Sequence, residues 1–155
     1  MPHAVLLGVC HPAFSVGTSE ATCHTSREET DEFFSAKSFG VCNWFPEHGQ
    51  HLVVDADREA FIALNPAGKI FQHVGAEGQW LVVRYGANTY RVNPDVLRPV
   101  PAPAFDVGQA VTARGRLGIV PDVTWHFKEA APIYFLQIDG KRSFRRYSEA
   151  ELVPA

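Results

Sequence analysis

The sequence has few cysteines, no long apolar run and no dense charge, and each of these features excludes a class of protein. Three cysteines among 155 residues, an odd number at irregular spacing, do not provide the pairs of a disulfide framework. No apolar stretch approaches the roughly 18 residues that a membrane helix requires. Charged residues make up 20% of the chain and no tract is of low complexity, which argues against global disorder.

A secretory signal is also missing from the first residues. The short apolar run Val5–Val9 has no Lys or Arg before it and is shorter than the apolar core of a signal peptide. We therefore expect a soluble, cytoplasmic protein that does not bind a membrane.

The motifs of several enzyme classes are absent as well. We find no glycine-rich phosphate loop, no paired-carboxylate signature and no nucleophile elbow, and the turn Gly115–Gly118 has the wrong length for a phosphate cradle. The formal charge of −3 is uneven: residues 1–104 carry 11 acidic and 7 basic side chains, and residues 105–155 carry 6 and 7. This balance does not indicate a basic nucleic-acid domain, and we expect a binding protein without enzymatic activity or cofactor.

The most informative positive feature is an internal repeat. Residues 80–100 and 134–154 both read as an apolar strand led by an aromatic residue, a glycine turn, an aromatic-Arg pair, an acidic residue in a polar turn, and then Leu close to Pro. Gly86 and Gly140 stand at the same place in the two copies. The pattern predicts two copies of one small β unit, an arrangement that usually binds rather than catalyses.

Hydrophobic periodicity and turn residues predict the elements along the chain. A capping-box spacing at Ser26 predicts a short helix over 27–36, and a second helix is predicted to begin at Asp55 or Asp57 and to hold residues 58–64. The segment 38–49 reads as irregular, and Gly75–Gly78 reads as a turn. Alternating or apolar runs predict strands over 69–74, 79–85, 89–92, 109–113, 117–120, 123–127, 133–138 and 143–147.

These elements predict a mainly β chain with short helices, of the α+β class. Residues 1–100 are expected to form a helix-bearing α+β unit with a small antiparallel sheet, and three prolines make residues 99–104 a stiff linker. Residues 105–155 hold five short strands with a short final turn, the size and rhythm of an SH3-like barrel. We expect the two β units to pack together, because each alone is near the size at which a core is marginal.

Two segments resemble known families. Phe105–Gln109, Gly115–Ile119, Trp125–Lys128 and Tyr134–Arg142 resemble a small SH3-like bacterial domain, and the motif Trp44-Phe-Pro-Glu-His-Gly49 looks like that of an uncharacterised bacterial domain family. Domains of both kinds often belong to small cytoplasmic proteins encoded beside secreted antibacterial toxins. The resemblance implies an immunity protein that binds its cognate toxin and occludes the toxin's active site.

The candidate partner-binding residues form three groups. Trp44, Phe45 and Glu47 either plug the junction between the helices and the first sheet or form a recognition surface of rigid aromatic anchors. The acidic group would suit a toxin with a basic substrate groove, and the basic group lies on a predicted hairpin and would hold an acidic partner. Their members are Glu28, Glu29, Asp31 and Glu32 for the acidic group, and Arg142, Arg145 and Arg146 for the basic group.

Two alternatives stay open. The C-terminal unit could be an SH3-like adaptor that binds RNA or a ribosomal partner, although the acids Asp139, Glu149 and Glu151 dilute its positive field and make nucleic acid an unlikely partner. The pairs Cys10-His11 and Cys23-His24 have the right side chains for zinc or a reactive thiol. Their spacing is not that of a metal site, and we expect no metal.

Overall fold

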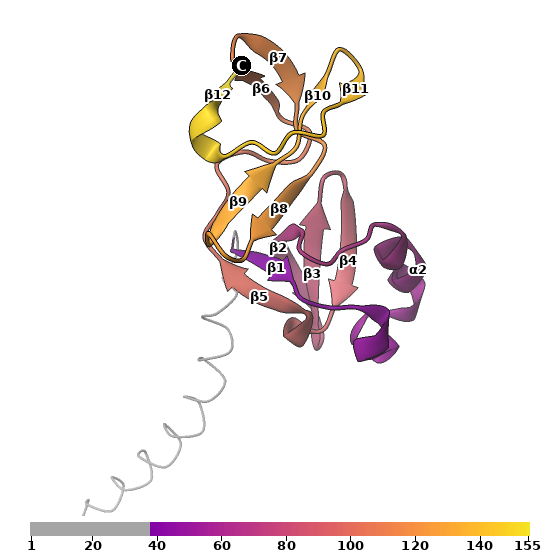
Figure 1. Ribbon diagram of the computed structural model, residues 1–155. Helices are drawn as coiled ribbons and strands as arrows, with labels where there is room; N and C mark the ends of the chain where they lie inside the picture. Colours follow the sequence, from indigo (N-terminus) through magenta and orange to yellow (C-terminus); the bar gives the residue numbers. More distant parts are fainter. Residues whose placement is uncertain (1–37) are drawn as a thin grey trace, which may run out of the picture. The chain divides into compact units, whose positions relative to one another are not determined.

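The computed structural model describes residues 38–155, and this part of the chain is mainly β, with one α-helix and several 3₁₀ turns (Figure 1). The first sheet has five antiparallel strands in the order β4-β3-β2-β1-β5. Its strands are β1 (Phe39–Cys42), β2 (Ile70–Glu77), β3 (Trp80–Tyr85), β4 (Asn88–Val92) and β5 (Leu97–Val100). Between β1 and β2 lie the turns η1 (Pro46–His48) and η2 (Gln50–Leu52) and the helix α2 (Asp55–Ala63).

The second sheet also has five strands, in the order β11-β10-β7-β6-β12, and a separate hairpin joins β8 to β9. No sheet in residues 38–155 closes into a barrel. The strands of the second sheet are β6 (Ala110–Ala113), β7 (Arg116–Ile119), β10 (Gln137–Ile138), β11 (Lys141–Arg142) and β12 (Leu152–Pro154). The hairpin consists of β8 (Val123–His126) and β9 (Ala131–Tyr134).

The two sheets share one strand order, which agrees with the repeat predicted from the sequence. In each sheet the fourth, third, second, first and fifth strands follow one another from edge to edge. A 3₁₀ turn precedes the fifth strand in both, η3 (Pro94–Val96) and η4 (Glu149–Glu151). Leu97 then lies opposite Cys42, and Leu152 opposite Ala113, so a buried leucine begins the fifth strand in both sheets.

The first core is aromatic and lies between α2 and one face of the first sheet. Phe61, the buried residue of α2, is 5.5 Å from the Trp44 ring, 5.5 Å from the Phe71 ring and 5.3 Å from the Tyr90 ring. Helix and sheet are also joined by Asp57, which accepts hydrogen bonds from the backbone N–H and the guanidinium of Arg91 at 2.9 and 2.8 Å. Packing of these large rings explains why a helix of nine residues is stable here.

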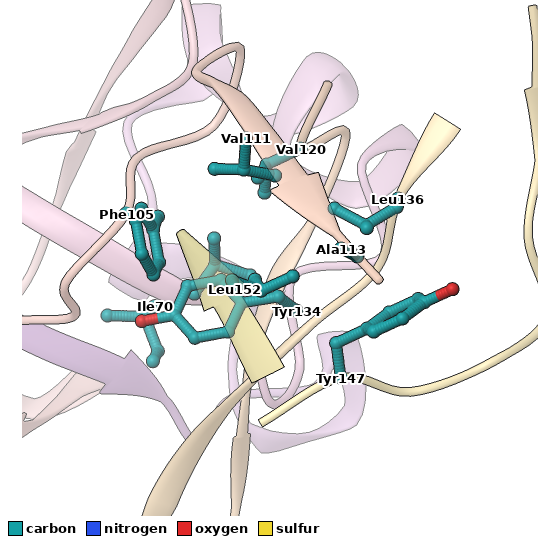
Figure 2. Packing of buried hydrophobic residues seen from close by; sticks show 10 residues of the cluster. Ile70, Phe105, Val111, Ala113, Val120, Tyr134, Leu136, Tyr147 and Leu152 are labelled. Carbon is teal, nitrogen blue, oxygen red and sulfur yellow. The ribbon is translucent and has the colours of Figure 1, made fainter. Parts of the chain in front are cut away.

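The second core contains Val111, Val120, Tyr134, Leu136 and other buried residues (Figure 2). Ile70, which belongs to β2 of the first sheet, is part of this cluster, and Figure 2 labels it next to Phe105 and Tyr134. The two β units therefore share buried apolar surface, as the sequence analysis expected. Two isolated contacts add to this junction: a bridge from Lys69 to Thr124 and a hydrogen bond from the Trp125 N–H to the Gly68 carbonyl at 2.8 Å.

Several predicted elements are confirmed. Helix α2 begins at Asp55, one of the two starts that the sequence allowed, and β3, β4, β6, β7 and β8 match their predicted strands within two residues at each end. The predicted helix over 27–36 lies outside the described residues. Within residues 38–100 the structure holds helix α2 and a five-stranded antiparallel sheet.

Other predictions were wrong at turns and edges. The segment 38–49 is not wholly irregular, because β1 pairs with both β2 and β5 and its partners lie far away in sequence. The predicted turn at Gly75–Gly78 is mostly strand: β2 continues to Glu77 through a bulge between His73 and Gly75. Pro99 lies in the edge strand β5 rather than in a linker, which is the position a sheet allows to proline.

The C-terminal strands also differ from prediction. The predicted strand 133–138 divides into the end of β9 and the two residues of β10. Residues 143–147 form no ladder, and only Tyr147 makes an isolated bridge, to Tyr134. Arg145 and Arg146 therefore do not lie on a strand as predicted, because β11 ends at Arg142.

Candidate partner-binding surfaces

The loop after β1 buries one of its two aromatic residues and exposes the other. Trp44 is only 1% exposed, and its indole N–H donates to the Gly49 carbonyl at 3.0 Å. Phe45 is 47% exposed, and its ring meets the His48 ring edge-on at 5.4 Å. Trp44 therefore belongs to the core, as the plug interpretation expected, and is not available as a partner contact. Phe45 and Glu47 are exposed, and their contact with a partner stays a prediction.

Phe45 is one of the residues that line a mainly apolar cleft of about 210 Å³. The cleft lies between this loop and the end of α2, and Pro46, Ile62, Pro66 and Ala67 line it. Proline rings and short aliphatic side chains make a rigid apolar surface, because they have few rotamers to lose on binding. The cleft can hold one apolar side chain of a partner while Phe45 packs beside it.

Gly49 fixes the path of this loop. Its φ of 134° lies in a region that strongly favours glycine, and a Cβ at this position would be 2.7 Å from Cε1 of His51. The Phe45 N–H donates to Nδ1 of His48 at 3.3 Å. These contacts constrain the backbone of the loop that carries Phe45.

The basic group on the C-terminal segment is largely paired within the chain. Arg142 forms an ion pair with Asp122 at 2.5 Å and lies over the Phe135 ring at 5.3 Å. Arg145 forms an ion pair with Glu151 at 2.7 Å and lies over the Tyr147 ring at 5.3 Å. Both cations are therefore partly neutralised, Arg145 by one of the acids that the sequence analysis named and Arg142 by Asp122, which that analysis did not name.

Phe144 lies between these arginines and is 98% exposed. The sequence analysis did not choose Phe144 as a partner contact, because it treated this residue as part of a regular strand over residues 143–147. Arg146 is exposed and lines a groove of about 470 Å³ together with His126, Tyr147 and Glu149. The segment thus presents an aromatic ring and a cation close together in the sequence.

A buried carboxylate joins the two β units. Asp122 accepts hydrogen bonds from the Lys69 ammonium at 2.8 Å and from the Tyr85 hydroxyl at 2.6 Å, in addition to its ion pair with Arg142. Burial opposes its ionisation, but hydrogen bonds from Lys69 and Tyr85 outweigh burial and lower the pKa of Asp122. Burial, and next the hydrogen bond to Asp122, raise the pKa of Tyr85.

We call these four residues, Lys69, Tyr85, Asp122 and Arg142, the Asp122 clamp. Lys69 and Asp122 are 53 positions apart in the sequence, and no local motif marks them. The clamp assigns a structural role to Arg142, which the sequence analysis had selected only as a partner contact.

The remaining predicted residues all lie before the described part of the chain. Glu28, Glu29, Asp31, Glu32 and the two Cys-His pairs lie outside the described residues. Burial raises the pKa of the Cys42 thiol to about 12, so this thiol stays protonated at neutral pH. Within residues 38–155 there is no group of three or more His, Cys, Asp or Glu side chains placed to hold a metal ion.

Comparison with protein families gives one match. Residues 34–153 match the model of a family of unknown function, DUF6960. The chain belongs to this family. The match runs through both sheets, so the family is defined over both β units and not over one of them.

No curated protein matches the chain. Among the described residues of this family member, no helix is long and apolar enough to cross a membrane.

Proposed function

We propose that this DUF6960 member is a cytoplasmic immunity protein, which binds a bacterial toxin and occludes the toxin's active site. The observation that carries the proposal is the exposed ring of Phe45 beside the apolar cleft. An exposed aromatic side chain next to an apolar pocket has the features of a binding hot spot. The resemblance of the Trp44–Gly49 motif and of residues 105–155 to toxin-associated families supports the choice of partner.

Occlusion requires charge that complements a toxin cleft. Glu47 is exposed two residues from Phe45, and the sequence from 1 to 104 carries four more acidic than basic side chains. Such a surface suits the basic substrate groove of a nuclease or of an enzyme that uses nucleotides. Glu28, Glu29, Asp31 and Glu32 contribute to this acidic excess in the sequence. Arg145 and Arg146 would be separate contacts, to acidic groups of the toxin.

The strand order also supports an SH3-like C-terminal unit. Its first and fifth strands, β6 and β12, pair with each other, and the short turn η4 precedes the fifth. We propose that the second sheet and the β8-β9 hairpin together form an SH3-like unit. Folds of this kind carry many functions, so the toxin partner is argued from the Phe45 surface and not from the fold.

A pull-down tests the proposal. The tagged full-length chain would be recovered from cells that also express the product of the neighbouring gene, and growth protection against that product would be scored in parallel. We expect a stoichiometric complex with that protein, and Phe45→Ala should weaken it at least about tenfold. Val74→Ala is the matched control, because Val74 is a similarly exposed apolar residue. Absence of a complex and of protection would disprove the toxin proposal.

One observation favours a second function, RNA binding by the C-terminal segment. Phe144 is almost wholly exposed and is followed by Arg145 and Arg146, and an exposed ring next to cations can stack on a base. This function predicts RNA binding that weakens with salt and with Phe144→Ala. Recovery of RNA in the same pull-down would favour it, and no binding at low salt would exclude it.

A further inference from the structure

One face of the second sheet is apolar and open. Thr112 in β6 lies opposite Leu117 in β7 and opposite Val153 in β12, so the three side chains project to the same side. Ile119 follows Leu117 by two residues and shares that side. Leu117, Val153 and Ile119 are 63%, 60% and 49% exposed. We call the surface of these four residues the outer face.

The outer face carries no charge of its own. Ala110 and Gln137, the residues opposite Ile119, are both uncharged. The strand pairings place one charged residue, Arg142, on the same side opposite Gln137, and Arg142 is paired with Asp122 at 2.5 Å. Arg145 is paired with Glu151 at 2.7 Å. A neutral aliphatic face is poorly suited to a partner that is recognised by strong charge.

The repeat shows what covers the same face in the first sheet. The pair Cys42–Leu97 in the first sheet corresponds to the pair Ala113–Leu152 in the second. One residue earlier in the first strand of each sheet, Val41 then corresponds to Thr112. Their partners in the second strand, Ile70 and Leu117, correspond as well. Val41 and Ile70 are both buried, and Ile70 belongs to the core of the second unit (Figure 2). This face of the repeated unit is therefore already used once in the chain to contact another β unit.

We propose that the outer face binds the outer face of a second copy of this chain, about a two-fold axis. A two-fold contact brings each surface against itself, and a neutral aliphatic face satisfies this requirement without like-charge repulsion. Two sheets can stack face to face through interdigitating aliphatic side chains. Because the apolar part contains three exposed aliphatic side chains, the dimer is reversible and depends on concentration.

Sedimentation equilibrium of the full-length chain over a concentration series tests this interface. The wild type should show a monomer–dimer equilibrium. Leu117→Glu places a carboxylate in the contact and should weaken dimerisation at least about tenfold, with an unchanged circular dichroism spectrum and melting temperature. Phe144→Ser, which removes an exposed apolar side chain outside the outer face, is the control and should dimerise like the wild type.

Two results would overturn the proposal. One is a wild type that stays monomeric at every concentration. This result would overturn the dimer proposal whatever else binds the outer face. The other is a folded Leu117→Glu variant that dimerises like the wild type. If Leu117→Glu does not fold, Ile119→Thr serves instead, since threonine is favourable in a strand and the same weakening is expected. This proposal does not depend on toxin binding, which is tested through Phe45.

Discussion

The two β units of this chain have the same strand order but are covered in different ways. In the first sheet, α2 places Phe61 on an aromatic core that includes Phe71 and Tyr90. In the second unit no helix longer than a 3₁₀ turn is present, and Phe144, which the sequence repeat aligns with Tyr90, is 98% exposed. The repeated pattern therefore specifies strands and turns, whereas the insertion between the first two strands decides which aromatic residues become core.

The strongest test of this difference removes the ring at the centre of the first core. Phe61→Ala should lower the free energy of unfolding by about 3–5 kcal/mol, because it leaves a cavity among Trp44, Phe71 and Tyr90. Phe144→Ala should change it by less than about 0.5 kcal/mol, because that ring has almost no contacts to lose. Urea unfolding of both variants measures the contrast, and similar losses would mean that Phe144 is also buried.

The next effect concerns the junction between the units. Asp122→Asn should cost about 3 kcal/mol, because it removes the charge that Lys69 and Arg142 share in the Asp122 clamp. Asp139→Asn, which loses only the exposed pair with Arg116, is the matched control and should cost at most about 1 kcal/mol. Equal losses in the free energy of unfolding for the two variants would show that the Asp122 clamp does not join the two β units.

The Asp122 clamp also predicts that the free energy of unfolding depends on pH. The pKa of Asp122 is lower in the folded protein than its ordinary value of 3.8, so its stabilising contribution is present above about pH 4. The contribution is lost as the pH falls from there through the folded pKa. The free energy of unfolding of the wild type and that of Asp122→Asn, each measured at a series of pH values, should therefore converge between pH 6 and about pH 3. A difference between the two free energies of unfolding that stays constant over this pH range would contradict a stabilising role for the Asp122 charge.

Local signals predicted much of the fold, and distant contacts account for the errors. Alternation and turn residues identified most strands, and the acidic residues at Asp55 and Asp57 marked the start of α2. Strand β1 was missed because both of its partners are distant in sequence. For the candidate site, the motif indicated Phe45 and Glu47 but could not distinguish the exposed ring from Trp44, since that depends on the packing of α2.

The equivalent turn glycines give a finer comparison. Gly86 and Gly140 have φ values of 62° and 76°, so Ala at either position should cost about 1 kcal/mol in backbone strain. A Cβ at Gly86 would also lie 3.3 Å from Cγ1 of Val107, whereas nothing lies within 4 Å of one at Gly140. Gly86→Ala should therefore lower the melting temperature more than Gly140→Ala does. The reverse order would mean that Val107 moves aside without cost.

The smallest effect is expected where the first unit has Cys42 and the second has Ala113 at the matched position. Cys42→Ala should cost up to about 1 kcal/mol, because a single buried sulfur is lost beside Leu97. In a chain with Cys10 and Cys23 changed to Ser, alkylation of the native protein at pH 8 should be far slower than that of the unfolded chain, since burial raises the Cys42 pKa to about 12. Rapid native alkylation would place this thiol at the surface and would remove the match with the buried Ala113.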